Sequence, residues 1–91
     1  MCRNIRTLFN FEPPATDEEV QAAALQFVRK LSGYHTPSQA NTKAFERALR
    51  EVTASSRRLV DALVTSAPAR DREVVASQAR ARAARRYGSS R

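Results

Sequence analysis

The chain has 91 residues and a mass of 10.2 kDa, which is enough for one folded domain and too little for two. Sixteen basic residues against nine acidic ones give a net charge of +7, and the pI is about 11.0. Two glycines, four prolines and one cysteine exclude collagen-like, low-complexity and disulfide-stabilised folds. Neither a signal peptide nor an apolar run long enough to span a membrane is visible. We therefore expect a cytoplasmic protein of one domain, residues 1–91, that makes no contact with membranes.

The first fifteen residues lack a helical period but are too apolar for a free tail. Two consecutive prolines, Pro13 and Pro14, stop any regular element before residue 16. We expect residues 1–15 to form an extended N-terminal arm that packs on the domain or on a second copy of the chain. The alternative is an exposed apolar patch for another partner. The apolar residues of this arm are Ile5, Leu8, Phe9 and Phe11.

A capping box predicts the first helix, over residues 17–32. Thr16 can accept a hydrogen bond from the backbone of Glu19, whose side chain can reach back to the backbone of Thr16. Gly33 suits the left-handed position that ends many helices. Apolar residues recur on one face at helical spacing, and we expect this face to be buried. They are Val20, Ala24, Phe27, Val28 and Leu31.

A second, longer helix is predicted over residues 37–66. Pro37 is favourable at a first helical position, and Pro68 disfavours helix at Ala67. Asn41 is an alternative cap, in which case a single turn precedes the main helix. One face carries apolar residues at alternating steps of four and three, a spacing typical of helices packed lengthwise, interrupted by a single serine. We call this face the seam; its residues are Phe45, Leu49, Val52, Ser56, Leu59 and Leu63. Opposite charges four residues apart are expected to pair on the solvated face of this helix: Glu46 with Arg50, Arg47 with Glu51 and Arg57 with Asp61.

A third helix, of medium length, is predicted over residues 71–87, opened by Asp71 and Glu73 and ended by Gly88. Small residues and one tyrosine form a stripe that would allow close helix packing. The stripe consists of Ala76, Ala79, Ala83 and Tyr87. The sequence thus predicts an all-α fold with short, long and medium helices in a small orthogonal or antiparallel bundle. The first two helices should form an antiparallel hairpin.

Composition excludes several kinds of site. One cysteine and one histidine cannot build a zinc site, and two glycines cannot build a phosphate-binding loop, so we expect no metal and no cofactor. His35, the only side chain suited to be a general base near neutral pH, falls in the loop after Gly33, where we expect it to be exposed rather than catalytic. Cys2 is the weak candidate for catalysis, as a nucleophile or a redox-sensing thiol, because Arg3 and Arg6 would favour its thiolate. Alternatively, Cys2 simply packs with the arm.

The basic residues concentrate at the end of the chain, where residues 70–91 hold seven arginines and two acidic residues. On a helix, Arg82, Arg85 and Arg86 fall within an arc of about 100°. Arginine pairs with two phosphate oxygens at once, so this face is a candidate for sequence-independent contact with nucleic acid. Two alternatives remain open: arginines in a last turn complement the helix dipole, and arginine has GC-rich codons.

Several segments together resemble a family of small bacterial proteins of unknown function. The most specific is the opening Met-Cys-Arg-Asn-Ile, followed by the run from Leu8 to Thr16. Further matching segments are Arg29-Lys30-x-Ser32-Gly33, Pro37-Ser38, Asn41 with Ala44-Phe45, and Arg70-Asp71-Arg72-Glu73-Val74. Ala69 departs from the pattern of these sequences, which often have a second proline after Pro68. The resemblance implies a stand-alone bacterial cytoplasmic protein and brings no activity, cofactor or catalytic residue.

From the residues and the resemblance we expect a non-enzymatic helical module for binding or assembly. Its candidate partners are nucleic acid, contacted through the C-terminal arginines, and further copies of the chain. The alternative is a thiol-dependent function centred on Cys2.

Overall fold

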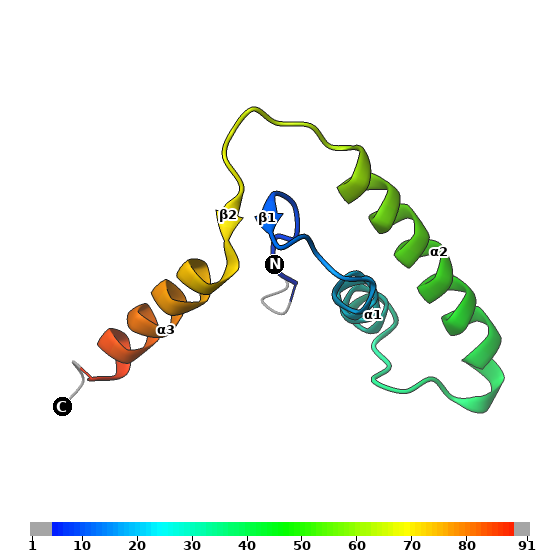
Figure 1. Ribbon diagram of the computed structural model, residues 1–91. Helices are drawn as coiled ribbons and strands as arrows, with labels where there is room; N and C mark the ends of the chain where they lie inside the picture. Colours follow the sequence, from blue (N-terminus) through cyan, green and yellow to red (C-terminus); the bar gives the residue numbers. More distant parts are fainter. Residues whose placement is uncertain (1–4, 89–91) are drawn as a thin grey trace.

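The computed structural model describes residues 5–88, and the side chains of residues 5–85. Three α helices dominate this part of the chain: α1 (Asp17–Ser32), α2 (Thr42–Ala62) and α3 (Arg72–Gly88). A 3-10 turn, η1 (Gln39–Asn41), precedes α2, and two strands of two residues each, β1 (Phe11–Glu12) and β2 (Arg70–Asp71), complete the fold (Figure 1). The predicted all-α class with three helices is confirmed.

The predicted capping box opens α1. The backbone N–H of Glu19 donates to the Thr16 hydroxyl at 3.2 Å, and the backbone N–H of Thr16 donates to the Glu19 carboxylate at 2.9 Å. Gly33 ends the helix with a φ of +76°, and its N–H donates to the carbonyl of Arg29 at 2.9 Å. Both ends of α1 therefore follow from local sequence chemistry.

The second helix is shorter than predicted at both ends. Its first predicted turn is η1, and α2 itself begins only at Thr42. It ends at Ala62, four residues before the predicted end at residue 66, because Leu63 already has extended backbone with a ψ of 141°. Pro68 disfavours helix at Ala67, but it does not determine that the helix ends several residues earlier. Residues 63–69 instead form an exposed link to β2.

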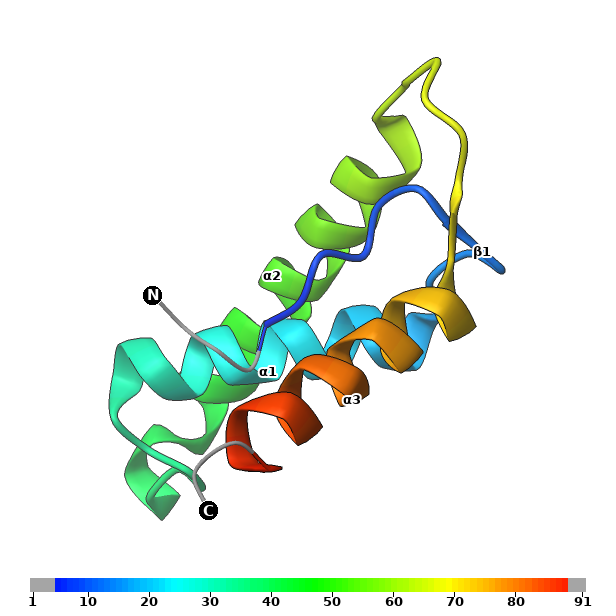
Figure 2. The same cartoon turned by 90° about the vertical axis from the view of Figure 1, so that its left-hand side faces the viewer.

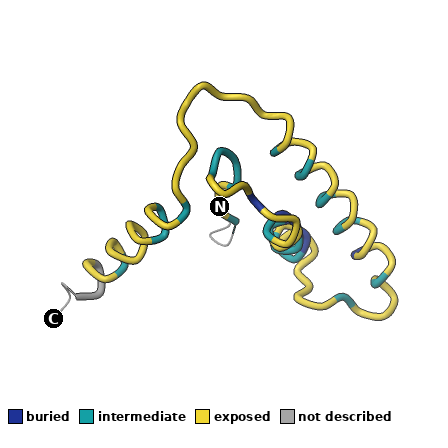
Figure 3. The backbone as a smooth tube through the Cα atoms, in the orientation of Figure 1, coloured by how far each residue is buried: buried dark blue, intermediate teal, exposed yellow. Residues whose placement is uncertain are grey.

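Helices α1 and α2 pack against each other as an oblique hairpin. In Figure 1 the view runs along α1 while α2 crosses it, and Figure 2 shows the two helices running in opposite senses. The core between them is small, and Figure 3 shows that buried positions are confined to this crossing and the approach to α1. The buried residues of the described chain are Ala15, Val20, Ala24, Val28 and Phe45.

Because the helices cross obliquely, the predicted faces are only partly covered. Phe27 and Leu31 were expected in the core, but they are exposed, Leu31 by 72%. On α2 the first half of the seam faces α1, whereas Leu59 and Leu63 lie beyond the crossing and are exposed. An oblique contact covers only a few turns of each helix, whereas a periodic sequence pattern runs the whole length of the helix.

The described part of the N-terminal arm is extended and packs on the segment before α3. Strand β1 pairs in parallel with β2, Phe11 opposite Arg70 and Glu12 opposite Asp71. Asn10, which adopts a φ of +65°, accepts a hydrogen bond from the backbone N–H of Arg70 at 2.9 Å. The guanidinium of Arg70 lies 4.5 Å from the centre of the Phe11 ring. Ile5, Leu8, Phe9 and Phe11 are each half-buried.

Among the described residues, the contacts that join helix α3 to the rest of the molecule lie at its amino end. The Asp71 carboxylate accepts hydrogen bonds from the backbone N–H groups of Glu73 and Val74, at 2.8 and 3.1 Å, and so caps the helix. Beyond this turn the helix projects away from the hairpin (Figure 1). No described helix packs along Ala76, Ala79 and Ala83, although we expected this stripe to serve helix packing; Tyr87 lies outside the described side chains. The chain is correspondingly open, with a radius of gyration of 16.4 Å.

Candidate functional site

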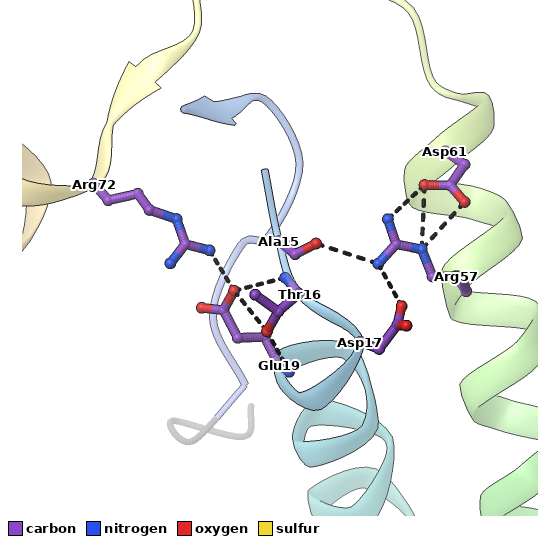
Figure 4. Close-up of polar contacts among 7 residues, drawn as sticks. All are labelled: Ala15, Thr16, Asp17, Glu19, Arg57, Asp61 and Arg72. Carbon is purple, nitrogen blue, oxygen red and sulfur yellow. Dashed lines mark hydrogen bonds and ion pairs between the residues drawn. The ribbon is translucent and has the colours of Figure 1, made fainter. Parts of the chain in front are cut away.

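A cluster of polar contacts that joins α1, α2 and α3 surrounds the amino end of α1 (Figure 4). Arg57, on α2, donates to Asp61 on its own helix at 2.7 Å. It also reaches across to the Asp17 carboxylate at 3.3 Å and to the carbonyl of Ala15 at 3.2 Å. The hydrogen bond between Arg57 and Asp61 raises the pKa of the arginine and lowers that of the carboxyl. Arg57 thereby ties α2 to the start of α1, a contact that the predicted pairing of Arg57 with Asp61 did not include.

A second arginine ties α3 to the same place. Arg72 donates through Nε to the carbonyl of Pro13 at 2.8 Å, and through Nη2 to the Glu19 carboxylate. The hydrogen bond from Arg72, followed by that from the Thr16 backbone, lowers the pKa of Glu19 below its usual value. Glu19 therefore closes the cap of α1 and also fixes the first residue of α3.

The residues of this junction hold one another, so the junction is a structural site. Asp17 and Asp61 neutralise the charge of Arg57, and Glu19 neutralises that of Arg72. Neither arginine therefore has a free positive charge with which to bind an anionic ligand. On α2, Arg47 pairs with Glu51 at 3.4 Å as predicted, whereas the predicted pair of Glu46 and Arg50 is absent from this described helix. Arg50 and Arg58, also on α2, are exposed and have no ion pair among the described residues.

Further exposed arginines lie on α3. Arg82 and Arg85 are exposed and make no ion pair or hydrogen bond with any described residue. Arg86 belongs to the same helix, and its side chain lies outside the described ones. Arg80 is equally exposed and unpaired within the described chain, although we had not included it in the candidate face. Arg80 falls outside the arc of about 100° that the other three share.

The other candidates gain no support from the geometry. Cys2 lies outside the described residues. His35 is exposed in the loop after α1, where its carbonyl accepts a hydrogen bond from Arg29 at 2.9 Å. Among residues 5–85, no three histidine, cysteine, aspartate or glutamate side chains lie close enough to hold a metal ion. None of the described helices combines the length and apolar character needed to cross a membrane.

Two open grooves flank the crossing of α1 and α2. The larger, of about 540 Å³, is lined by paired ionic groups such as Asp17 and Arg57. The smaller, of about 320 Å³, is mainly apolar and lies between Leu31, Tyr34 and the start of α2.

The comparisons with known proteins give one match. A family model described as an uncharacterized conserved protein, DUF2277, matches residues 1–78. No curated protein and no solved structure matches the chain.

Proposed function

Because the chain belongs to the uncharacterized conserved protein family DUF2277, whose description assigns no activity, we propose a function from the geometry of this chain itself. It is a non-enzymatic helical module that contacts nucleic acid without sequence preference through α3. The family match ends at residue 78, before Arg80, so the proposal concerns this chain and not the family as a whole.

One observation carries the proposal: α3 projects from the hairpin, and Arg80, Arg82 and Arg85 on it are exposed and unpaired within the described residues. A helix of 17 residues is about 25 Å long, a length over which a nucleic-acid duplex presents several phosphates. Glu73, in the first turn, is the single acidic residue in the sequence of α3. Part of the net charge of +7 is therefore exposed on α3, where the phosphates of a nucleic acid can contact it.

The described side chains of α3 favour contact with phosphates over reading of bases. They include no aromatic ring on which a base could stack. The arginine guanidinium pairs with two phosphate oxygens in parallel hydrogen bonds, and such contacts carry no sequence information. We therefore expect duplexes and single strands of unrelated sequence to bind with similar affinity.

The test measures binding of a fluorescent oligonucleotide by anisotropy at about 50 mM salt. Replacing Arg82, Arg85 and Arg86 together by alanine should weaken binding at least about tenfold, because each lost phosphate contact removes a released counterion. The control replaces three arginines of α2 by alanine, the same change in net charge. These are Arg47, Arg50 and Arg58, all exposed.

The control variant should bind within about threefold of the unmodified chain, because its arginines lie on the hairpin rather than on the projecting helix. Equal losses from the two variants would show that only net charge matters, and would refute the assignment to α3.

A further inference from the structure

We propose that residues 9–13 of the N-terminal arm form a clasp for β2 and α3, and that this clasp opens without unfolding the hairpin of α1 and α2. When it opens, β2 and α3 leave the arm together and stay joined to α2 by the exposed link of residues 63–69. The chain then has two conformations, one with α3 held against the hairpin and one with α3 tethered to it. The clasp is independent of the contact with nucleic acid proposed above.

One residue of the arm holds the chain on either side of Ala69. The Asn10 carbonyl accepts a hydrogen bond from the backbone N–H of Arg70 at 2.9 Å, and the Asn10 side-chain amide donates to the carbonyl of Pro68 at 3.1 Å. Asn10 makes both bonds from a left-handed backbone conformation, with a φ of +65°, which asparagine tolerates better than most residues with a side chain. The arm is thus shaped to grip the segment that leads into α3.

Two arginines complete the clasp from the side of β2 and α3. Arg70 donates through Nη2 to the carbonyl of Phe9 at 3.2 Å, and its guanidinium lies over the ring of Phe11. Arg72 donates to the carbonyl of Pro13 at 2.8 Å and to the carboxylate that closes the cap of α1. These contacts join residues 68–72 to the arm and to the first turn of α1, and they bypass α2.

The clasp can open by itself because the buried core lies elsewhere. The buried side chains of the helices belong to α1 and α2, whereas both residues of β2 are exposed and Val74, the first apolar residue of α3, is 52% exposed. A segment that few buried apolar contacts hold, and whose hydrogen bonds lie near solvent, opens more readily than a packed core. Release of β2 and α3 therefore leaves the packing of α1 on α2 in place.

The two conformations differ in the freedom of α3. While the clasp is closed, the pairing of β1 with β2 fixes the point at which α3 leaves the hairpin (Figure 1). Once it is open, α3 is held by the link alone, whose seven residues span at most about 24 Å when fully extended. The arm therefore determines whether α3 has a fixed or a variable orientation.

Amide hydrogen exchange of the unmodified chain, followed by NMR, tests whether the clasp opens separately. The N–H of Arg70 is bonded within the clasp, whereas Ala24 and Val28 lie in the buried part of α1. Protection of the Arg70 amide, corrected for its intrinsic exchange rate, should be at least about tenfold lower than that of the two α1 amides. Equal protection would show that α3 and the hairpin open as one unit, and would overturn the inference.

A pair of double variants tests what the clasp holds. Arg70→Ala with Arg72→Ala removes the guanidinium contacts but leaves the sequence of the arm and of the hairpin unchanged. The ¹⁵N–¹H NOE should fall across residues 73–85, whereas the amide shifts of Ala24 should remain those of the folded hairpin. The matched control, Arg50→Ala with Arg58→Ala, removes the same charge from exposed positions of α2 and should leave α3 fixed. An α3 that stays fixed in the first variant, or a hairpin that unfolds with its release, would overturn the inference.

Discussion

The extent of the core can be tested by comparing two truncations on α1, Val20→Ala and Leu31→Ala. Val20 is fully buried, whereas Leu31 is 72% exposed despite its place in the same apolar pattern. At about 0.8 kcal/mol per buried methylene, loss of two carbons at Val20 costs about 1.6 kcal/mol, and the cavity left behind brings the expected loss to about 2–3 kcal/mol. Leu31→Ala removes more carbon atoms, but most of that surface is already in water. We expect a loss of about 0.7 kcal/mol.

Urea unfolding followed by circular dichroism measures both free energies of unfolding, at one protein concentration so that any dimer contributes equally. We expect Val20→Ala to lower the free energy of unfolding by at least about 1 kcal/mol more than Leu31→Ala does. The slope of the free energy of unfolding against urea concentration should be the same in all three proteins. If Leu31→Ala were the costlier change, Leu31 would be in the core, and the oblique crossing of α1 and α2 would be refuted.

Two further predictions concern the contacts that hold α3. Glu19→Gln preserves the capping box but removes the charge that faces Arg72. Because the pKa of Glu19 is lowered on folding from its usual 4.5, its ionic contribution is present above that value and is lost as pH falls through the folded pKa. The unmodified chain should therefore exceed the variant in free energy of unfolding at pH 7 by about 1 kcal/mol, the upper end for a pair that is partly exposed to solvent. This difference should shrink as pH falls below 4.5, and a difference independent of pH would contradict the ion pair. Deletion of residues 1–12 should lower the Tm, because it removes β1, the Asn10 contact with Arg70 and the half-buried phenylalanines; unchanged melting and mass would show that the arm does not support the fold.

The features that were predicted correctly are those encoded by neighbouring residues. The capping box at Thr16 and Glu19 and the glycine end of α1 depend on hydrogen bonds within four residues. The Arg47 pair with Glu51 likewise follows from helical spacing alone. Such features are visible in a sequence because their partners are fixed by the helix itself.

What could not be predicted depends on how distant segments meet. The pairing of Phe11 with Arg70 joins two strands too short to show any alternation, and Arg72 meets Glu19 from 53 residues away. The exposure of Leu31 likewise depends on the crossing angle of two helices, which an apolar period does not specify. The free arginines of α3 were predicted as a face, but only the projection of the helix showed that Arg80 is exposed as well.

The proposed contact with nucleic acid is tested most directly by the salt dependence of oligonucleotide binding to the unmodified chain. The logarithm of the association constant should fall linearly with the logarithm of salt concentration, and the α3 triple-alanine variant should flatten this slope by about two to three units. Absence of binding at about 50 mM salt would contradict the proposal, and the arginines of α3 would then serve only solubility and the helix dipole.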